Sequence, residues 1–158
     1  MHHQLDKFDR VILQLLQSDA SLNTSEIASR VGLTQPPCWR RIKRLEELGL
    51  IKKRVALLDQ EKLGLNVTIF ARVKLAAHNR HMLPEFEEEI NTFPEVLECY
   101  TMMGEYDFLL KIVTKDIESY EYFFRKHLSQ MTAFHDVNSN VALSKVKYTT
   151  DLPLNLVE

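Results

Sequence analysis

The strongest constraint on the fold is a break of only two residues between two segments that each have the features of a short helix. Asn23 is suited to cap the first helix, and Glu26 stands where its side chain can reach back to the Asn23 amide. That helix is predicted over about residues 24–31. It ends at Gly32, which tolerates the left-handed backbone common after helices. Because only Gly32 and Leu33 precede the next start signal, a tight turn must join the two helices.

The second segment begins at Thr34, the next candidate cap, and carries Pro36 and Pro37 in its first turn, where a missing N–H costs little. It is predicted to run to about Leu48. An earlier helix is predicted over about residues 6–17. Its apolar residues follow helical spacing: Phe8, Val11, Ile12, Leu15 and Leu16. Two short helices joined by a tight glycine-containing turn form a helix-turn-helix, whose second helix lies in the major groove of DNA.

Positive charge is concentrated in this part of the chain. The 158 residues have a net charge of −2, but residues 1–60 carry ten Lys or Arg against seven Asp or Glu, whereas residues 61–158 carry ten against fifteen. Between Trp39 and Arg54, seven basic residues face only Glu46 and Glu47. A local excess of this kind on a weakly acidic protein indicates one surface that binds a polyanion.

We therefore predict a winged helix-turn-helix domain over residues 1–59 that binds double-stranded DNA. Residues 50–57 are expected to form a strand whose basic side chains reach phosphates, as a wing does. Gln35 can read a base edge, and arginines can pair with guanine or phosphate. The predicted DNA-binding residues are Thr34, Gln35, Pro36, Arg40, Arg41, Lys43, Arg44, Lys52, Lys53 and Arg54. The alternative is that the basic run is only a solvated helix face. Trp39 is expected to pack against the domain core.

A second domain is predicted over residues 67–158, after a short linker at residues 60–66. Strand and helix patterns there alternate as strand, helix, strand, strand, helix, strand. The expected elements are residues 67–75, 84–93, 96–103, 107–114, 118–131 and 136–149. This order is that of a ferredoxin-like βαββαβ domain, so the whole chain is predicted to be α+β.

A ferredoxin-like domain has an antiparallel sheet with helices on one face, and its other face must also be covered. We expect that open face to be apolar, formed by alternate residues of the strand at 67–75. The same sheet of a second subunit is the simplest cover, so a homodimer is predicted. A dimer also suits a DNA-binding half that recognises paired half-sites.

The turn Gly104-Glu105-Tyr106-Asp107, between two predicted strands, is the candidate ligand site. Glycine permits a tight turn whose exposed amides can bind a carboxylate, while the Asp107 carboxylate can bind an ammonium group. Those groups are the two ends of an amino acid. The alternative is a plain hairpin turn in which Asp107 accepts backbone hydrogen bonds, and composition alone favours that alternative.

Short segments from about Leu5 to Leu154 together carry a family resemblance. They are Leu5-Asp6-Lys7-Phe8-Asp9-Arg10, Val31-Gly32-Leu33-Thr34, Pro37-Cys38-Trp39-Arg40-Arg41, Arg44-Leu45-Glu46, Gly49-Leu50-Ile51, Pro94-Glu95-Val96, Gly104-Glu105-Tyr106-Asp107-Phe108-Leu109-Leu110 and Val146-Lys147-Tyr148. Each is weak alone, but in this order and spacing the chain resembles the Lrp/AsnC family, the feast/famine regulators of bacteria and archaea.

The resemblance implies a winged helix domain followed by the family's ferredoxin-like effector and oligomerisation domain. It implies dimers that commonly associate into octamers, and an amino-acid effector bound at the interface between dimers, near the Gly-x-x-Asp turn. Carried over by position, the effector-binding residues are Thr101, Gly104, Asp107, Asn140 and Val141. One departure concerns the recognition helix. Family members commonly begin it with Ser-Pro, whereas this chain has Thr34-Gln35-Pro36-Pro37, which can change the base preference.

Two other classes of protein compete with a regulator. An enzyme could use Glu105 and Asp107 as acid and base, but the chain lacks a Gly-rich phosphate loop, a nucleophile elbow and a metal motif. No catalytic site, metal site or cofactor is therefore expected. An architectural DNA-binding protein without an effector would have nearly the same sequence. No membrane-length apolar run or signal-peptide layout occurs, which predicts a cytoplasmic, nucleoid-associated protein with no membrane partner.

Overall fold

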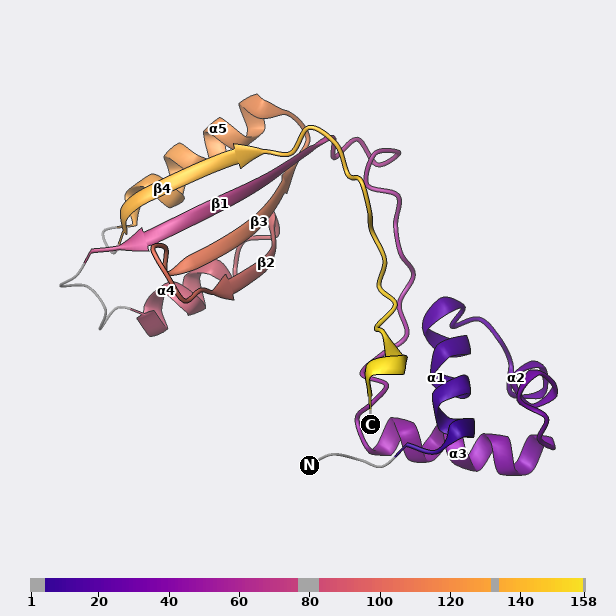
Figure 1. Ribbon diagram of the computed structural model, residues 1–158. Coiled ribbons are helices and arrows are strands. Elements are labelled where there is room, and N and C mark those ends of the chain that lie inside the picture. Colours follow the sequence, from indigo (N-terminus) through magenta and orange to yellow (C-terminus); the bar gives the residue numbers. More distant parts are fainter. Residues whose placement is uncertain (1–4, 77–82, 132–133, 158) are drawn as a thin grey trace. The chain divides into compact units, whose positions relative to one another are not determined.

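The computed structural model describes residues 5–76, 83–131 and 134–157 (Figure 1). The chain divides into two compact units, one of Met1–Leu57 with Lys147–Glu158 and one of Leu58–Val146. We call them the helix-turn-helix unit and the sheet unit. The sequence predicted that all of residues 67–158 form one domain, whereas the structure groups the C-terminal segment with the helix-turn-helix unit. None of the described helices has both the length and the hydropathy needed to cross a membrane.

Three helices form the helix-turn-helix unit: α1 (Lys7–Ser18), α2 (Thr24–Val31) and α3 (Gln35–Glu47). Each begins and ends within about one residue of its predicted bounds. Their apolar sides meet in one core of Leu5, Ile12, Leu16, Leu22, Ile27, Ala28, Cys38, Ile42 and Leu45. Of the five apolar residues whose spacing predicted α1, Ile12 and Leu16 are buried in this core, whereas Phe8 and Val11 are each 37% exposed.

Side chains and backbone geometry set the helix ends. The Glu26 amide donates to Asn23 Oδ1 (3.0 Å), and the Asn23 amide donates to Glu26 Oε2 (2.8 Å), so the predicted capping box of α2 is formed. Gly32 then takes the left-handed conformation, with φ +76°. Thr34 occupies the capping position of α3, but its side chain makes no capping hydrogen bond, contrary to expectation. The start of α3 thus depends on its prolines and on the turn before it.

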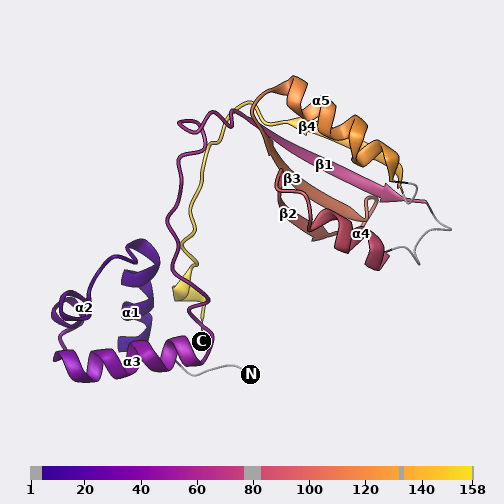
Figure 2. The ribbon, with the colours of Figure 1, turned by 180° about the vertical axis from the view of Figure 1, so that it is seen from behind.

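Residues 50–57 do not form the predicted wing strand. Lys52, Lys53 and Arg54 lie in a segment without regular secondary structure. A strand requires a ladder partner, and the described part of the chain provides none for this segment. In both ribbon views the segment runs beside residues 147–152 (Figures 1 and 2). The last strand is also shorter than predicted, because it ends at Val141 instead of near residue 149.

The sheet unit has the predicted order of elements. They are β1 (Val67–Leu75), α4 (Leu83–Ile90), β2 (Val96–Thr101), β3 (Phe108–Thr114), α5 (Ile117–Lys126) and β4 (Phe134–Val141). The sheet is antiparallel with strand order β2-β3-β1-β4. The helix expected to reach Met131 ends at Lys126 and is followed by a short 3₁₀ turn at Leu128–Gln130.

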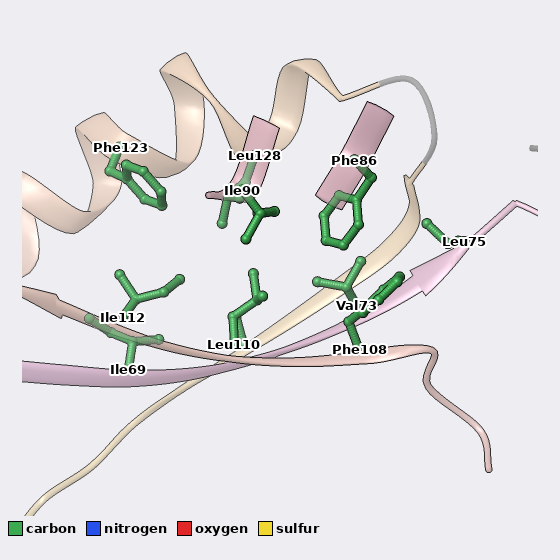
Figure 3. Packing of buried hydrophobic residues seen from close by; sticks show 11 residues of the cluster. Ile69, Val73, Leu75, Phe86, Ile90, Phe108, Leu110, Ile112, Phe123 and Leu128 are labelled. Atoms are coloured by element: carbon green, nitrogen blue, oxygen red, sulfur yellow. The ribbon is translucent and has the colours of Figure 1, made fainter. Parts of the chain in front are cut away.

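Both helices cover the same face of the sheet (Figure 3). Between them and the strands lie Ile69, Ala71, Val73, Leu75, Phe86, Ile90, Phe108, Leu110, Ile112, Phe123 and Leu128, all buried. The rings of Phe86 and Phe108 approach to 4.4 Å between centroids, which fixes α4 on β3. Truncating a core residue such as Leu110 to alanine costs about 2–5 kcal/mol, so this layer sets the shape of the sheet.

The open face of the sheet is more polar than predicted. The apolar alternate residues of β1 point into the covered core, so the opposite face carries Thr68, Phe70, Arg72 and Lys74. Arg72 donates to Asn138 Oδ1 (3.0 Å), and Lys111 pairs with Glu98 (2.6 Å). The prediction of an apolar open face was therefore wrong, because the helices already use the apolar side of β1. Phe70 remains 39% exposed there.

Candidate nucleic-acid interface and ligand-binding turn

The outer side of α3 is exposed and basic. Cys38, Ile42 and Leu45 face the core and are buried. With about 100° between successive residues of a helix, the opposite side of α3 carries Pro36, Arg40, Lys43 and Glu47, all of them exposed. This is the side of the helix that a DNA major groove can receive.

Arg41 and Arg44 contact α1. Arg41 Nη1 donates to Asp9 Oδ1 (2.8 Å) and to Asp6 Oδ2 (2.6 Å), and the guanidinium carbon lies 5.3 Å from the centre of the Phe8 ring. Arg44 Nη2 donates to Asp9 Oδ2. Asp9 is fully buried, so these two arginines compensate a carboxylate inside the protein. Two of the predicted DNA-binding residues thus have a contact within the unit that the sequence did not predict.

Asp6 has two roles in this cluster. It caps α1 by accepting from the Asp9 amide (2.9 Å), and it pairs with Arg41. Desolvation raises the pKa of Asp6, but the Asp9 amide and the Arg41 guanidinium outweigh it, so the pKa lies below its usual value. The hydrogen bond to Asp6 in turn raises the pKa of Arg41. Both groups therefore stay charged at neutral pH.

The remaining predicted cations fall into two groups. Lys43 Nζ and Arg54 Nη2 both bond to Glu46, at 2.8 Å and 3.1 Å, and the hydrogen bond from Lys43 is the main cause of a lowered Glu46 pKa. Arg40, Lys52 and Lys53 are exposed and make no ion pair with any residue that the structure describes. These three are the cations most available to phosphate groups.

A hollow of about 360 Å³ lies beside the first turns of α3. It is lined by Asp6, Pro37, Arg40, Arg41 and Arg44. Three arginine side chains therefore surround one small space on the same unit that carries the exposed face of α3. The guanidinium group has five N–H donors, more than the acidic side chains here use. The unused donors can bond to the oxygens of an anion, while the Asp6 carboxylate on the same lining stays paired with Arg41.

Trp39 does not pack in the core, as the sequence analysis expected. It is 52% exposed on the flank of α3, because Cys38, Ile42 and Leu45 already fill the inner side of the helix. A large aromatic residue at this position is a candidate contact for DNA that the sequence analysis missed. The available signal was its place just outside the apolar stripe of the helix.

The candidate ligand turn has features of both alternatives that the sequence left open, a ligand-binding turn and a structural hairpin turn. Gly104 has φ +138°, a backbone conformation that favours glycine. The Asp107 amide donates to the Val73 carbonyl (2.9 Å), and its carbonyl accepts from the Met102 amide (2.8 Å). Asp107 Oδ2 accepts from the Leu75 amide (2.8 Å), which is the backbone bond expected of a structural turn. The residue is only partly buried, and no described residue donates to the second carboxylate oxygen, Oδ1.

The other three predicted effector residues lie on the two edge strands of the sheet. Thr101 pairs with Phe108 on edge strand β2, and Phe108 in turn pairs with Val73. Asn140 and Val141 are on the opposite edge strand, β4, beside the start of β1. With about 3.3 Å per residue and 4.8 Å between strands, the two groups are separated by roughly 10 Å along the sheet and 14 Å across it. A site containing all five residues would require two chains.

A helix-turn-helix with an exposed basic helix face, followed by a βαββαβ domain with a glycine turn at its edge, defines a DNA-binding regulator with a separate ligand-binding domain. The chain belongs to the Lrp/AsnC family. Residues 68–152 match the family's Lrp/AsnC ligand binding domain, and residues 5–52 match the winged helix-turn-helix DNA-binding domain. The protein is a transcription regulator and not an enzyme, as the sequence predicted.

Known proteins of the same kind match nearly the whole chain. It is 41% identical over 150 residues to the DNA-binding transcriptional activator DecR of Escherichia coli (strain K12), covering 95% of this chain and 99% of that protein. The crystal structure of an AsnC family transcriptional regulator from Agrobacterium tumefaciens has a TM-score of 0.91 at 43% identity, over 96% and 98% of the two chains. A transcriptional regulator from Neisseria meningitidis, in complex with L-Met, has a TM-score of 0.92 at 36% identity over the same shares. The predicted α+β fold and family are confirmed.

Proposed function

We propose that this regulator binds its DNA site with α3 in the major groove and that an amino acid, bound between chains of an oligomer, modulates that binding. The observation that carries the DNA part is the outer side of α3, which is exposed, basic and followed by two further uncompensated cations. Thr34, Gln35 and Pro36 lie at the N-terminal end of α3, the end that comes nearest to base edges. Arg40 and Lys43 follow on the same side, and Lys52 and Lys53 reach the phosphates.

Two substitutions test this interface, with a DNA duplex selected by the wild-type protein from a random pool as the probe. Arg40→Ala should weaken binding by about 1–3 kcal/mol if the arginine reads a guanine. Lys53→Ala should instead weaken all duplexes alike and flatten the salt dependence, since it removes one phosphate contact. Lys62→Ala, an 85% exposed lysine of the sheet unit, is the matched control. If Arg40→Ala and Lys53→Ala both bind as the control does, the interface is misplaced.

The effector part rests on the turn at Gly104–Asp107 and on the L-Met complex of the Neisseria meningitidis relative. The carboxylate of an amino acid can meet the amides of residues 104–106, which donate to no residue that the structure describes, while its ammonium group meets Asp107. Thr101 of the same chain adds a polar contact. Asn140 and Val141 of another chain complete the set. Melting curves with each of the twenty amino acids test this, because a ligand of the native state raises the melting temperature by mass action.

The same proposal requires an oligomer. We propose a homodimer through the sheet units that assembles further into an octamer, so that effector sites lie between dimers. Ligand binding is then coupled to assembly, because a ligand favours whichever oligomer holds it better. Light scattering of the full chain, with and without the amino acid that shifts the melting temperature, measures this coupling. A monomer at micromolar concentration would refute this oligomeric part.

A further inference from the structure

Asp9 is a fully buried carboxylate whose partners come from the helix that faces DNA. Its Oδ1 accepts from Arg41, and its Oδ2 accepts from Arg44 and from the Asp6 amide (3.3 Å). Asp9 itself lies in the first turn of α1, where the capping box fixes its backbone. The carboxylate is therefore held in place on one side and holds two arginines on the other.

An arginine that is already ordered before DNA binds loses less side-chain entropy on binding. A free arginine loses rotamer freedom when it docks on a phosphate, and that loss opposes binding. Here the loss occurs when the protein folds, because Arg41 is held by Asp6, Asp9 and the ring of Phe8, and Arg44 by Asp9. Both arginines line the hollow that Arg40 also lines.

We propose that Asp9 is a positioning residue for DNA recognition. It orients the guanidinium groups of Arg41 and Arg44 so that a backbone phosphate of DNA binds in the hollow beside Arg40. This inference rests on the proposed docking of α3 in the major groove. It also gives the acidic residue a role opposite to the one that its charge alone implies, because a negative charge near DNA should otherwise weaken binding.

The Asp9→Asn variant of the full chain separates the two roles. Asparagine has nearly the same shape but no charge, so it cannot compensate both arginines. The probes are the duplex selected by the wild-type protein and an unrelated duplex of equal length, measured by fluorescence anisotropy well below the melting temperature of the variant. Both duplexes should be bound more weakly, by up to about tenfold, because a displaced phosphate contact weakens binding to every sequence alike. The added positive charge alone predicts the opposite, tighter binding of both duplexes.

Two outcomes would overturn the proposal. Affinity for both duplexes could rise together, as the added positive charge alone predicts, or both affinities could stay as in wild type. Asp59→Asn is the matched control, since it removes one exposed acidic charge in the sheet unit and should leave both affinities as in wild type.

A second variant covers the case in which Asp9→Asn does not fold. Asp6→Asn keeps a good helix cap and keeps Asp9, but Arg41 loses one acceptor. It should weaken binding of both duplexes by a smaller factor, and unchanged affinities would overturn the proposal. Arg40→Ala identifies which idea has failed. If it weakens binding of the selected duplex while both aspartate variants behave as wild type, only the positioning role is wrong. If it has no effect either, the docking of α3 is wrong as well.

Discussion

The side-chain amide of Gln17 and the backbone of Leu152 bond to each other in both directions. The Leu152 amide donates to Gln17 Oε1 (2.9 Å), and Gln17 Nε2 donates to the Leu152 carbonyl (3.1 Å). Ser18 adds a bond to the Asp151 carboxylate (3.3 Å). Because 135 positions separate Gln17 from Leu152, the chain leaves the helix-turn-helix unit, builds the sheet unit and returns to α1. Two covalent segments therefore join the units, where the sequence predicted one linker.

Gln17→Ala should release the C-terminal segment without unfolding α1. The substitution removes a pair of exposed hydrogen bonds, each with a net value of about 0.5–1.5 kcal/mol, and alanine is a good helix former. Amide hydrogen exchange at Leu152 should accelerate, while exchange at core residues such as Ile12 stays slow. Ser25→Ala, at an exposed position of α2, is the control. Equal protection of Leu152 in the two variants would show that the pairing does not hold the segment.

Arg40 and Arg41 are neighbours, but their substitutions should differ greatly in their effect on stability. Arg41→Ala leaves the buried Asp9 with one arginine instead of two, and breaking a buried ion pair costs about 3–5 kcal/mol. Arg40→Ala removes an exposed side chain and should change the free energy of unfolding by less than about 0.5 kcal/mol. Urea unfolding followed by Trp39 fluorescence reports on this unit alone, since Trp39 is the only tryptophan of the chain. Equal losses in both variants would contradict the structural role of Arg41.

Trp39 should report DNA binding directly. It is half exposed on the flank of α3, so a duplex that receives α3 shields its indole from water. We expect the emission to move to shorter wavelength or lose intensity when the selected duplex is added. The change should disappear at high salt, where the phosphate contacts weaken. An unchanged spectrum at saturating DNA would show that this flank of α3 faces away from the duplex.

Glu98 makes the sheet unit sensitive to acid. The hydrogen bond from Lys111 (2.6 Å), helped by the Tyr100 hydroxyl (2.7 Å), holds the pKa of Glu98 below its usual value. A carboxyl whose pKa is lower in the folded state stabilises the fold above its unfolded pKa, and this contribution is lost as the pH falls through the folded value. The melting temperature should therefore fall below about pH 4. Glu98→Gln should reduce the part of that fall that belongs to the sheet unit. A parallel curve for the variant would exclude Glu98 as a cause.

The sequence predicted local features well and tertiary ones poorly. Asn23, Glu26 and Gly32 determine the ends of α2 through contacts a few residues apart, so the bounds of α2 could be predicted. The burial of Asp9 depends on Arg41, 32 positions away, and no local pattern marks a carboxylate that will lie inside. Alternation in β1 gave its bounds but not which side the helices would cover. The strand predicted at residues 50–57 does not form, because an extended sequence pattern does not specify a ladder partner.

Two substitutions at Asp107 can separate its structural role in the turn from a role in binding the effector. Asp107 Oδ2 accepts from the Leu75 amide (2.8 Å), and this bond ties the turn after β2 to the end of β1. Asn in place of Asp keeps a carbonyl oxygen for the Leu75 amide but removes the negative charge that would pair with an ammonium group. Ala removes both. The two variants therefore differ in the structural bond and share the loss of charge.

Asp107→Asn should keep nearly the wild-type melting temperature, whereas Asp107→Ala should lose about 1–3 kcal/mol because the Leu75 amide is left without its acceptor. Both should lose the rise in melting temperature that the effector amino acid produces in the wild-type protein, since the ammonium group no longer meets a carboxylate. Basal DNA affinity should stay unchanged in Asp107→Asn, because the turn belongs to the sheet unit. If Asp107→Asn still responds to the amino acid as wild type does, Asp107 does not pair with the ammonium group, and its bond to Leu75 is its whole role.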